Sequence, residues 1–382
     1  MSLFSLNADH KALRNSILSF CRAELADGAE ERDRTRTFPR ALWNKCGEMG
    51  IQGLPVPADI GGMGLDPLSS AVALEALGYG CPDGGLLMSL CAHLLANVVP
   101  IWKHGSPAQH DRYLGDLCAG RTICAVGMTE PSAGSDPYSM TTRAVPDGDG
   151  WVITGRKTLI SNAPVADLAL VYARTDEGKG FHGGITTFLI EHPCFERGQA
   201  FETMGLRSCP IGELVLDEVR VGPEAVVGRV GAGGPVFFES MNWERTLLVA
   251  CHVGVMERLL DEAIRYSRTR SSGGVPIAKH QAVAHRIADM KVKLEAARLL
   301  TYKAASKLDR SHDVALHASI AKLFVSESLV SCALDAVRTL GGYGYAAEYE
   351  VERAMRDAVG GILYSGTSDI QRVLISRWLL GV

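Results

Sequence analysis

The pattern of hydrophobic positions divides this chain of 382 residues into three regions with different periods. From about residue 7 to residue 119, apolar side chains recur three and four positions apart, as Leu13 and Ile17 do, which places them on one face of a helix. Between about residues 121 and 227, short runs rich in Val, Ile, Leu and Thr predict strands. After residue 228 the helical period returns and persists.

Residues that start and stop helices punctuate the first region. Phe38 and Pro39 open one predicted helix, and Gly50 closes it. The stretch 105–107, Gly-Ser-Pro, ends one helix and begins another, with serine as the N-cap and proline in the first turn. His93 lies in an apolar helical run and is interpreted as a core residue rather than as a catalyst.

The middle region predicts a small antiparallel β-domain. A turn at residues 144–150 separates two extended pieces, and strands are expected at 168–174, 184–190 and 213–221. Each run is short, rich in β-branched and aliphatic residues and bounded by turn residues, which is the pattern of strands rather than helices.

The last region predicts an antiparallel bundle of three or four long helices, including one near 239–268 and one from about Val314 to Leu340. The predicted fold class is therefore α+β. Its divisions are an N-terminal helical domain at 1–120, a β-barrel-like middle domain at 121–227 and a C-terminal helical bundle at 228–382.

Composition narrows the class of protein. Hydrophobic residues make up 47% and charged residues 21%, as in a globular protein, and the net charge of -4 argues against a nucleic-acid partner. Ten cysteines show no CxxC or metal-type spacing, so we expect reduced core thiols and no metal site. We find neither a leader-like N-terminus nor an apolar run of membrane-spanning length, and therefore predict a cytoplasmic protein without membrane contact.

The first candidate ligand-binding stretch is residues 128–136, Met-Thr-Glu-Pro-Ser-Ala-Gly-Ser-Asp. This composition suits a tight turn that offers polar groups to a planar ligand, because Thr129 and Ser135 supply hydroxyls and Gly134 lets the backbone approach closely. A second stretch, 151–162 with the sequence WVITGRKTLISN, follows one hairpin later. Taken alone, such a turn is more often an ordinary surface loop.

Together, the two stretches resemble the flavin-binding residues of the acyl-CoA dehydrogenase superfamily. The C-terminal half carries further stretches similar to superfamily signatures, in the same order: Arg270, 277–281 (IAKHQ), 340–345 (LGGYGY), 355–357 (MRD) and 364–371 (YSGTSDIQ). The resemblance extends over almost the whole chain. It implies an N-terminal helical domain, a middle antiparallel β-domain and a C-terminal four-helix bundle, with FAD between the β-domain and the bundle and a homotetramer built from dimers.

The resemblance also assigns FAD-binding residues by position. Those expected to hold the isoalloxazine are Met128, Thr129, Ser135 and Ser161. Those expected elsewhere on the cofactor are Arg338, Gly341, Gly342, Thr367 and Asp369, of which the last two would meet the adenine end. Arg270 and Gln281 would reach the FAD of a neighbouring subunit, so oligomerisation would be part of cofactor binding.

Three positions depart from the pattern of the superfamily. Leu159 stands where an aromatic residue usually covers the flavin, and Gly273 replaces a phenylalanine. Both changes weaken stacking on the cofactor. Arg338 replaces a glutamine near the pyrophosphate, where its charge would add a phosphate contact.

The reaction of this superfamily needs a base that removes a proton beside a thioester carbonyl while hydride leaves the adjacent carbon for the flavin. Most members carry a glutamate for this purpose just before Gly-Thr in the last motif, where this chain has Ser365. A minority, including isovaleryl-CoA dehydrogenase, place the glutamate before an arginine on an early bundle helix, and residues 241–245 here read MNWER. The resemblance implies that Glu244 is the base. The alternative is a solvated or salt-bridged helix glutamate.

Three residues are expected on the substrate side. Arg245 would steer the substrate side of the cleft, and Tyr364 would contact the substrate. The backbone N–H of Ser365 would polarise the thioester oxygen, a contact that does not depend on the side chain.

Short stretches indicate a substrate. Residues 89–93 (SLCAH), 162–167 (NAPVAD), 209–210 and 243–244 look most like the prolyl-carrier-protein dehydrogenases of pyrrole biosynthesis, which oxidise an aminoacyl thioester on a phosphopantetheine arm. The sequence MRD at 355–357 looks more like the ordinary acyl-CoA enzymes, so a short or branched-chain acyl-CoA stays open as the substrate.

The expected partners are an acyl or peptidyl carrier protein, or a CoA thioester, and an electron acceptor that is either electron-transfer flavoprotein or oxygen. A flavin monooxygenase or oxidase on the same fold is the alternative from another reaction class, because members that activate oxygen also lack the glutamate at the position of Ser365. A non-catalytic binding protein is a third reading, against which Glu244 and Arg245 argue.

Overall fold

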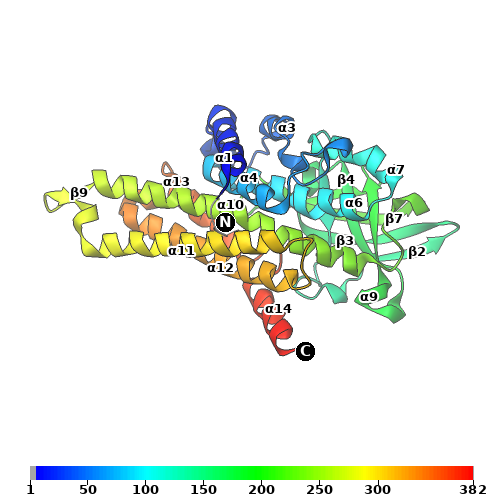
Figure 1. The fold of residues 1–382 in the computed structure, drawn as a ribbon. Helices are drawn as coiled ribbons and strands as arrows, with labels where there is room; N and C mark the ends of the chain where they lie inside the picture. Colours follow the sequence, from blue (N-terminus) through cyan, green and yellow to red (C-terminus); the bar gives the residue numbers. More distant parts are fainter. Residues whose placement is uncertain (1–5, 382) are drawn as a thin grey trace.

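The computed structural model describes residues 6–381, and along them a helical region, a sheet and a second helical region follow one another (Figure 1). The helices of the first region are α1 (Ala8–Phe20), α2 (Ala29–Thr35), α3 (Arg40–Glu48), α4 (Pro67–Gly80), α5 (Gly84–His93), α6 (Val99–His104), α7 (Pro107–Gln109) and α8 (Gly115–Cys118). The predicted helix boundaries are confirmed, since α3 lies between Pro39 and Gly50. Ser106 caps α7 in a capping box with Gln109.

The helix pair α5 and α6 corrects one expectation from the sequence. Together with the π-helical turn between them, Gly84–His104 is long and apolar enough to cross a membrane, by length and composition alone. However, 94% of its most apolar window is buried inside the protein, as in the core helix of a globular domain. His93 is a core residue as predicted, because its ring accepts from Cys124 N and contacts the Leu117 carbonyl.

The middle region is one eight-stranded sheet. Its strands are β1 (Cys124–Gly127), β2 (Arg143–Asp147), β3 (Gly150–Ser161), β4 (Leu168–Arg174), β5 (Ile185–Glu191), β6 (Glu196–Ala200), β7 (Ile211–Val221) and β8 (Val226–Val227), with the short α9 (Phe181–Gly184) before β5. The spatial order is β6-β7-β3-β2-β4-β5-β8, and β1 pairs with β4. The three predicted strands lie within two residues of β4, β5 and β7.

The sheet differs from the prediction in two details. It is mixed rather than wholly antiparallel, because β4 pairs in parallel with β1 and, at one position, with β2. The predicted turn at 144–150 is shorter than expected, since residues 144–147 belong to β2 and Asp147 pairs with Gly150. Gly148, whose φ is 63°, supplies the left-handed conformation that the two-residue hairpin needs.

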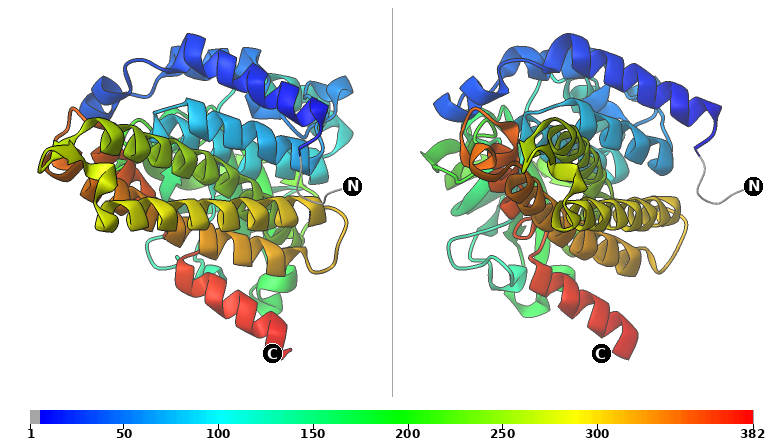
Figure 2. Two further views of the ribbon diagram at one scale, coloured as in Figure 1. Left: turned by 60° about the vertical axis from the view of Figure 1, so that its left-hand side comes forward. Right: turned by 90° about the vertical axis from the view of Figure 1, so that its left-hand side faces the viewer.

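The C-terminal region is a helical bundle, as predicted. Its elements are α10 (Gly233–Thr269), the hairpin strands β9 (Ser271–Ser272) and β10 (Val275–Pro276), α11 (Gln281–Lys307), α12 (Val314–Leu340), α13 (Glu350–Gly361) and α14 (Ser368–Leu380). The helix α12 has the predicted bounds. The long helix α10 runs from the sheet to the opposite end of the molecule, where β9 lies, and α14 projects away from the bundle (Figures 1 and 2).

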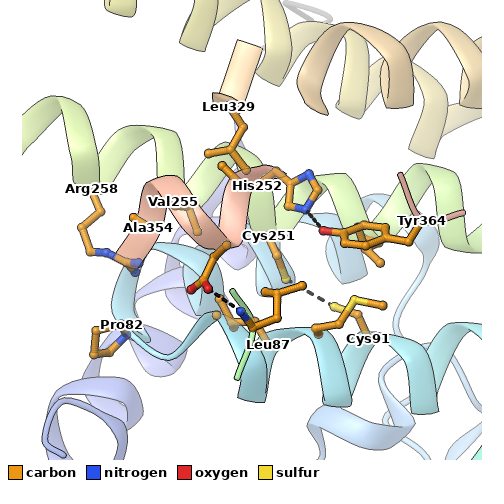
Figure 3. A pocket seen from close by; sticks show the side chains of 16 residues that line it. Pro82, Leu87, Cys91, Cys251, His252, Val255, Arg258, Leu329, Ala354 and Tyr364 are labelled. Atoms are coloured by element: carbon orange, nitrogen blue, oxygen red, sulfur yellow. Dashed lines mark hydrogen bonds between the residues drawn. The ribbon is translucent and has the colours of Figure 1, made fainter. Parts of the chain in front are cut away.

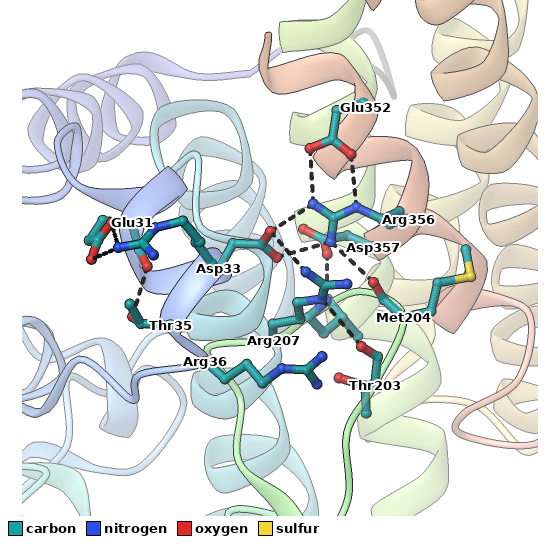
Figure 4. A network of polar contacts seen from close by, with 12 residues as sticks. Glu31, Asp33, Thr35, Arg36, Thr203, Met204, Arg207, Glu352, Arg356 and Asp357 are labelled. Carbon is teal, nitrogen blue, oxygen red and sulfur yellow. Dashed lines mark hydrogen bonds and ion pairs between the residues drawn. The ribbon is translucent and has the colours of Figure 1, made fainter. Parts of the chain in front are cut away.

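A polar network joins the three regions (Figure 4). Arg356 of α13 donates to both carboxylate oxygens of Asp33 in α2, at 2.7 and 3.1 Å, and to Glu352. It also donates to the carbonyl of Met204, in the loop between β6 and β7. Arg207 of the same loop approaches Asp33 as well. These contacts fix the β6–β7 loop against α13.

All ten cysteines are free thiols. Nine are buried, as expected for core residues, whereas Cys194 is exposed and corrects that expectation for one position. It follows His192 and Pro193 in the connection between β5 and β6. Connecting segments run over the protein surface, so a cysteine there is exposed.

Candidate active site

The candidate base lies at a contact between α10 and the turn that joins α13 to α14. Glu244 is 6% exposed, and the hydroxyl of Ser365 donates to its Oε1 at 2.5 Å. Ser365 and Gly366 have φ values of 56° and 85°, and this left-handed pair turns the chain sharply before Thr367 caps α14. The backbone N–H of Ser365 has no acceptor among the described residues, so it stays available to a ligand.

Burial dominates the electrostatics of this contact. Burial raises the pKa of Glu244 above its ordinary value, while the Ser365 hydrogen bond and the charges of Arg245 and Lys322 lower it in part. Arg245 is also buried, which lowers its pKa to about 10, and its Nε donates to the carbonyl of Ser365 at 2.9 Å. Arg245 therefore holds the turn beside the base, rather than extending into an open cleft.

The sequence analysis did not identify two buried titratable residues in this region. Lys322 of α12 is 1% exposed, and burial together with the charge of Arg245 lowers its pKa to about 8. His252 lies two turns after Glu244 on α10, and burial lowers its pKa to about 3. Both stand in apolar runs, where core packing is the ordinary interpretation, and the only available signal was a lysine inside the apolar run 319–325.

A cavity of about 50 Å³ opens beside the turn (Figure 3). Leu248, one helical turn after Glu244, lines it together with His252 and Tyr364, the residue before Ser365. The Nε2 atom of His252 lies 2.7 Å from the Tyr364 hydroxyl. The remaining wall is mostly apolar and comes from α5, α10, α12, α13 and the β6–β7 loop.

The two stretches predicted to bind flavin meet in the sheet domain. The N–H of Thr158 donates to the carbonyl of Thr129 at 2.9 Å, which joins the turn at 128–136 to β3. Leu159 is 61% exposed, with φ at 56°, at an irregularity between β3 and β7. The side-chain hydroxyls of Thr129 and Ser135 have no partner within residues 6–381. Free hydroxyls beside an exposed backbone fit the edge of a polar ring system such as flavin.

A buried ion pair supports this turn and was not predicted. The ammonium of Lys157 donates to Glu130 at 2.8 Å and to the carbonyl of Met128 at 3.2 Å, and both charged side chains are inaccessible to solvent. Burial lowers the pKa of Lys157 to about 8. The pKa of Glu130 falls to about 2, because Lys157 and hydrogen bonds from residues 141–142 outweigh the effect of its burial.

The other predicted FAD residues lie in different parts of the chain. Ser161 ends β3 near the first stretch, while Thr367 accepts from the N–H of Ile370 and Asp369 contacts Arg372 in the first turn of α14. The remaining five lie together at the far end of the bundle.

This far group gathers around β9, opposite to β3 in Figure 1. Arg270 directly precedes β9 and lies over the ring of Tyr343 at 5.7 Å, which brings the 341–343 turn to the same end. Gln281 begins α11, beyond the β9–β10 hairpin. The group consists of Arg270, Gln281, Arg338, Gly341 and Gly342. One chain therefore does not bring these five residues to its own flavin-binding turn.

Three family models together match most of the chain. The acyl-CoA dehydrogenase N-terminal domain matches residues 7–121, the middle domain 125–219 and the C-terminal domain 231–380. An L-prolyl-(peptidyl-carrier protein) dehydrogenase from Pseudomonas fluorescens is 38% identical over 379 residues, which is 98% of this chain and 99% of that protein. A short-chain specific acyl-CoA dehydrogenase from Clostridium acetobutylicum is 36% identical, and the match covers 98% of each chain.

Solved structures agree with these relatives. The prolyl acyl carrier protein oxidase AnaB has a TM-score of 0.95 and 39% identity, over 98% of this chain and 100% of that chain. PigA with FAD and proline has a TM-score of 0.96 and 37% identity, over 98% of each chain. The predicted fold and cofactor are thus confirmed, and the chain belongs to the acyl-CoA dehydrogenase family of FAD-dependent oxidoreductases.

Proposed function

We propose that this enzyme oxidises an aminoacyl thioester of the prolyl type, held on the phosphopantetheine arm of a carrier protein, with Glu244 as the base. The observation that carries the proposal is the buried carboxylate of Glu244, bonded to Ser365 beside an apolar cavity. Relatives named as prolyl-carrier-protein dehydrogenases, at 37 to 38% identity over nearly the whole chain, support the substrate class.

The chain's own residues would supply the proton chemistry. Glu244 would take the proton from the carbon next to the thioester carbonyl, and its burial favours this because a raised pKa makes a stronger base. The free N–H of Ser365 would donate to the thioester oxygen and stabilise the charge that develops there. Arg245 would keep Ser365 in place through its hydrogen bond to the carbonyl. The bound FAD supplies the acceptor for the hydride.

We assign the FAD contacts to residues from more than one chain. Thr129, Ser135 and Ser161 would contact the isoalloxazine, and Met128 and Leu159 would line it, with Thr367 and Asp369 at the adenine end of the same site. The far group around Arg270 would serve the FAD of a neighbouring subunit. Its distance from β3 within one chain supports this division (Figure 1).

Exposed apolar surface supports the homotetramer that this arrangement needs. On α14, Trp378, Leu379 and Leu380 are exposed, and so are Val292 and Leu299 on α11. Apolar side chains on projecting or outer helices are typical of surfaces that another chain covers. We therefore include a homotetramer in the proposal, as part of cofactor binding.

The proposal also covers the domain division and the surroundings of the enzyme. The boundaries 1–120, 121–227 and 228–382 fall in the connections between α8 and β1 and between β8 and α10. We place the enzyme in the cytoplasm, with electron-transfer flavoprotein or oxygen as the electron acceptor.

The test is a panel of prolyl and short acyl groups, each presented both on a carrier protein and on CoA. The proposal predicts anaerobic bleaching of the flavin by the prolyl carrier thioester alone, and mass spectrometry should show a loss of two or four hydrogens. Bleaching by CoA thioesters but not by carrier thioesters would favour the second candidate, a short or branched-chain acyl-CoA dehydrogenase. The apolar wall of the cavity and the Clostridium relative keep that candidate open.

The oxidase or monooxygenase reading is tested in the same experiment. The substrate would then fail to bleach the flavin without oxygen, and the product formed in air would contain a new oxygen atom. This outcome would show oxygenation rather than dehydrogenation. Bleaching without oxygen followed by fast reoxidation in air would leave the proposed dehydrogenation intact and name oxygen as the acceptor.

A further inference from the structure

The mostly apolar wall of the cavity includes a histidine–tyrosine pair (Figure 3). His252 and Tyr364 contact each other across it at 2.7 Å. The two charged lining residues also contact the rest of the protein, and Arg258 donates to three backbone carbonyls at 78–81 and pairs with Glu350. Asp357 accepts from the N–H of Leu206 at 2.5 Å, which fixes the β6–β7 loop.

Both members of the pair are neutral at physiological pH. Burial and the charge of Lys322 lower the pKa of His252 to about 3, and burial raises the pKa of Tyr364 well above its ordinary value. The Nδ1 atom of His252 has no partner among the described residues. When Nε2 carries the imidazole proton, the ring donates to the Tyr364 oxygen, and the phenolic hydrogen remains free for a ligand in the cavity.

The pair is close to the proposed chemistry. Tyr364 precedes Ser365, whose hydroxyl contacts Glu244, so its side chain enters the cavity from the turn that holds the base. In an aminoacyl thioester, the amine is bonded to the same carbon that loses its proton. An amine buried in an apolar cavity needs a hydrogen-bond partner, because an unpaired polar group there is unfavourable.

We propose that the hydroxyl of Tyr364, oriented by His252, donates a hydrogen bond to the neutral amine of the aminoacyl substrate and thereby selects aminoacyl over plain acyl groups. This inference rests on the proposed function, because it names the group that recognises the nitrogen of that substrate. Tyr364 contacts the substrate, whereas His252 is a positioning residue that acts through Tyr364.

The experiment compares prolyl and cyclopentanecarbonyl thioesters on the same carrier protein. The two rings have nearly the same shape, and a CH₂ replaces the NH in the second. Tyr364→Phe keeps the ring and removes the donor, so kcat/KM for the prolyl substrate should fall about tenfold or more. The value for the cyclopentanecarbonyl substrate should stay within about twofold. His252→Leu should lower the prolyl preference in the same direction, and His252→Gln, which restores an N–H donor, should recover part of it.

Tyr113→Phe is the matched control, since it removes a tyrosine hydroxyl that donates to Glu191 outside the cavity, and it should leave the preference unchanged. The flavin spectrum and the melting temperature report whether each variant is folded. An equal fall for both substrates with Tyr364→Phe, or no fall for either, would overturn the inference while the prolyl activity of the parent stands. A parent enzyme that does not oxidise the prolyl substrate would overturn the proposed function, and the inference with it.

Discussion

Replacing Lys322 with methionine should stabilise the protein and, at the same time, lower the ionised fraction of Glu244 near neutral pH. Lys322 is 1% exposed, and its ammonium has no hydrogen-bond partner among the described residues. Burial lowers its pKa from 10.5 to about 8. At about 1.4 kcal/mol per pKa unit, this difference sets an upper limit of roughly 3.5 kcal/mol on the unfavourable free energy of keeping the charge in the folded state.

The sign follows from proton binding. Between pH 8 and pH 10.5 the unfolded chain holds the Lys322 proton and the folded chain does not, so stability rises with pH across this window. Below about pH 8 the buried charge is present and destabilises the fold. Lys322→Met removes it and keeps most of the apolar volume, so the free energy of unfolding at pH 7 should increase by about 1 to 3 kcal/mol.

The same variant should slow the reaction near neutral pH. The charge of Lys322 lowers the pKa of Glu244, so without it the pKa rises and a smaller fraction of the base is ionised. The rate of flavin bleaching rises with pH as Glu244 ionises, and the whole profile should move to higher pH in Lys322→Met. Urea unfolding at fixed protein and FAD concentrations measures the first effect, and stopped-flow bleaching from pH 5.5 to 9 measures the second.

Lys303→Met is the control, because Lys303 is an exposed lysine on α11 and its loss should change neither quantity. A Lys322→Met variant that is less stable at pH 7 would refute the reasoning, since it would mean that the ammonium is well paired in the folded enzyme. An unchanged pH profile would show that its charge does not reach Glu244.

Further predictions concern FAD binding and the stability of the turn at 128–136. Thr129→Val or Ser135→Ala should each remove one hydrogen bond of about 0.5 to 1.5 kcal/mol to FAD, and a flavin fluorescence titration should show a correspondingly weaker Kd. Lys157→Met leaves Glu130 buried without its partner and should destabilise the protein by about 3 to 5 kcal/mol in urea unfolding. Arg270→Ala with Gln281→Ala should reduce FAD retention in a folded protein; sedimentation of the parent as a monomer with FAD fully bound would contradict the inter-subunit role.

Local sequence signals predicted the elements whose pattern is regular. The helix Val314–Leu340 and the strand Leu168–Arg174 have the predicted bounds, because each is mostly apolar along its length and turn residues stand at its ends. The parallel pairing of β1 with β4 was not predicted, since residues 124 and 168 are far apart in the chain and the pairing depends on the packed domain.

The site shows the same division. Family motifs identified Glu244 and Ser365 separately, and the structure adds that the two side chains bond to each other. Lys322, His252 and the Lys157–Glu130 pair were missed, because a single polar residue in an apolar run carries no sign of what it will face. Their surroundings depend on how α10, α12 and the turn at 128–136 pack against the rest of the protein, and a local sequence pattern does not predict such packing.

The chain carries its proposed base at Glu244 instead of at the position of Ser365, and this can be tested by placing a glutamate back at position 365. Glu244→Ala with Ser365→Glu places a carboxylate where most of the family carries it, and part of the bleaching rate should return. Recovery should be partial, because the turn at Ser365 is packed around a smaller side chain. A double variant as slow as Glu244→Ala alone would mean that the turn cannot present a base to the substrate.

The most direct test of the account is the anaerobic rate of flavin bleaching by the thioester substrate in Glu244→Gln, measured by stopped flow. Glutamine keeps the shape and hydrogen-bonding capacity but cannot act as a base, so the rate should fall roughly a hundredfold or more while FAD stays bound. A Glu244→Gln enzyme that bleaches as fast as the parent would show that the base lies elsewhere.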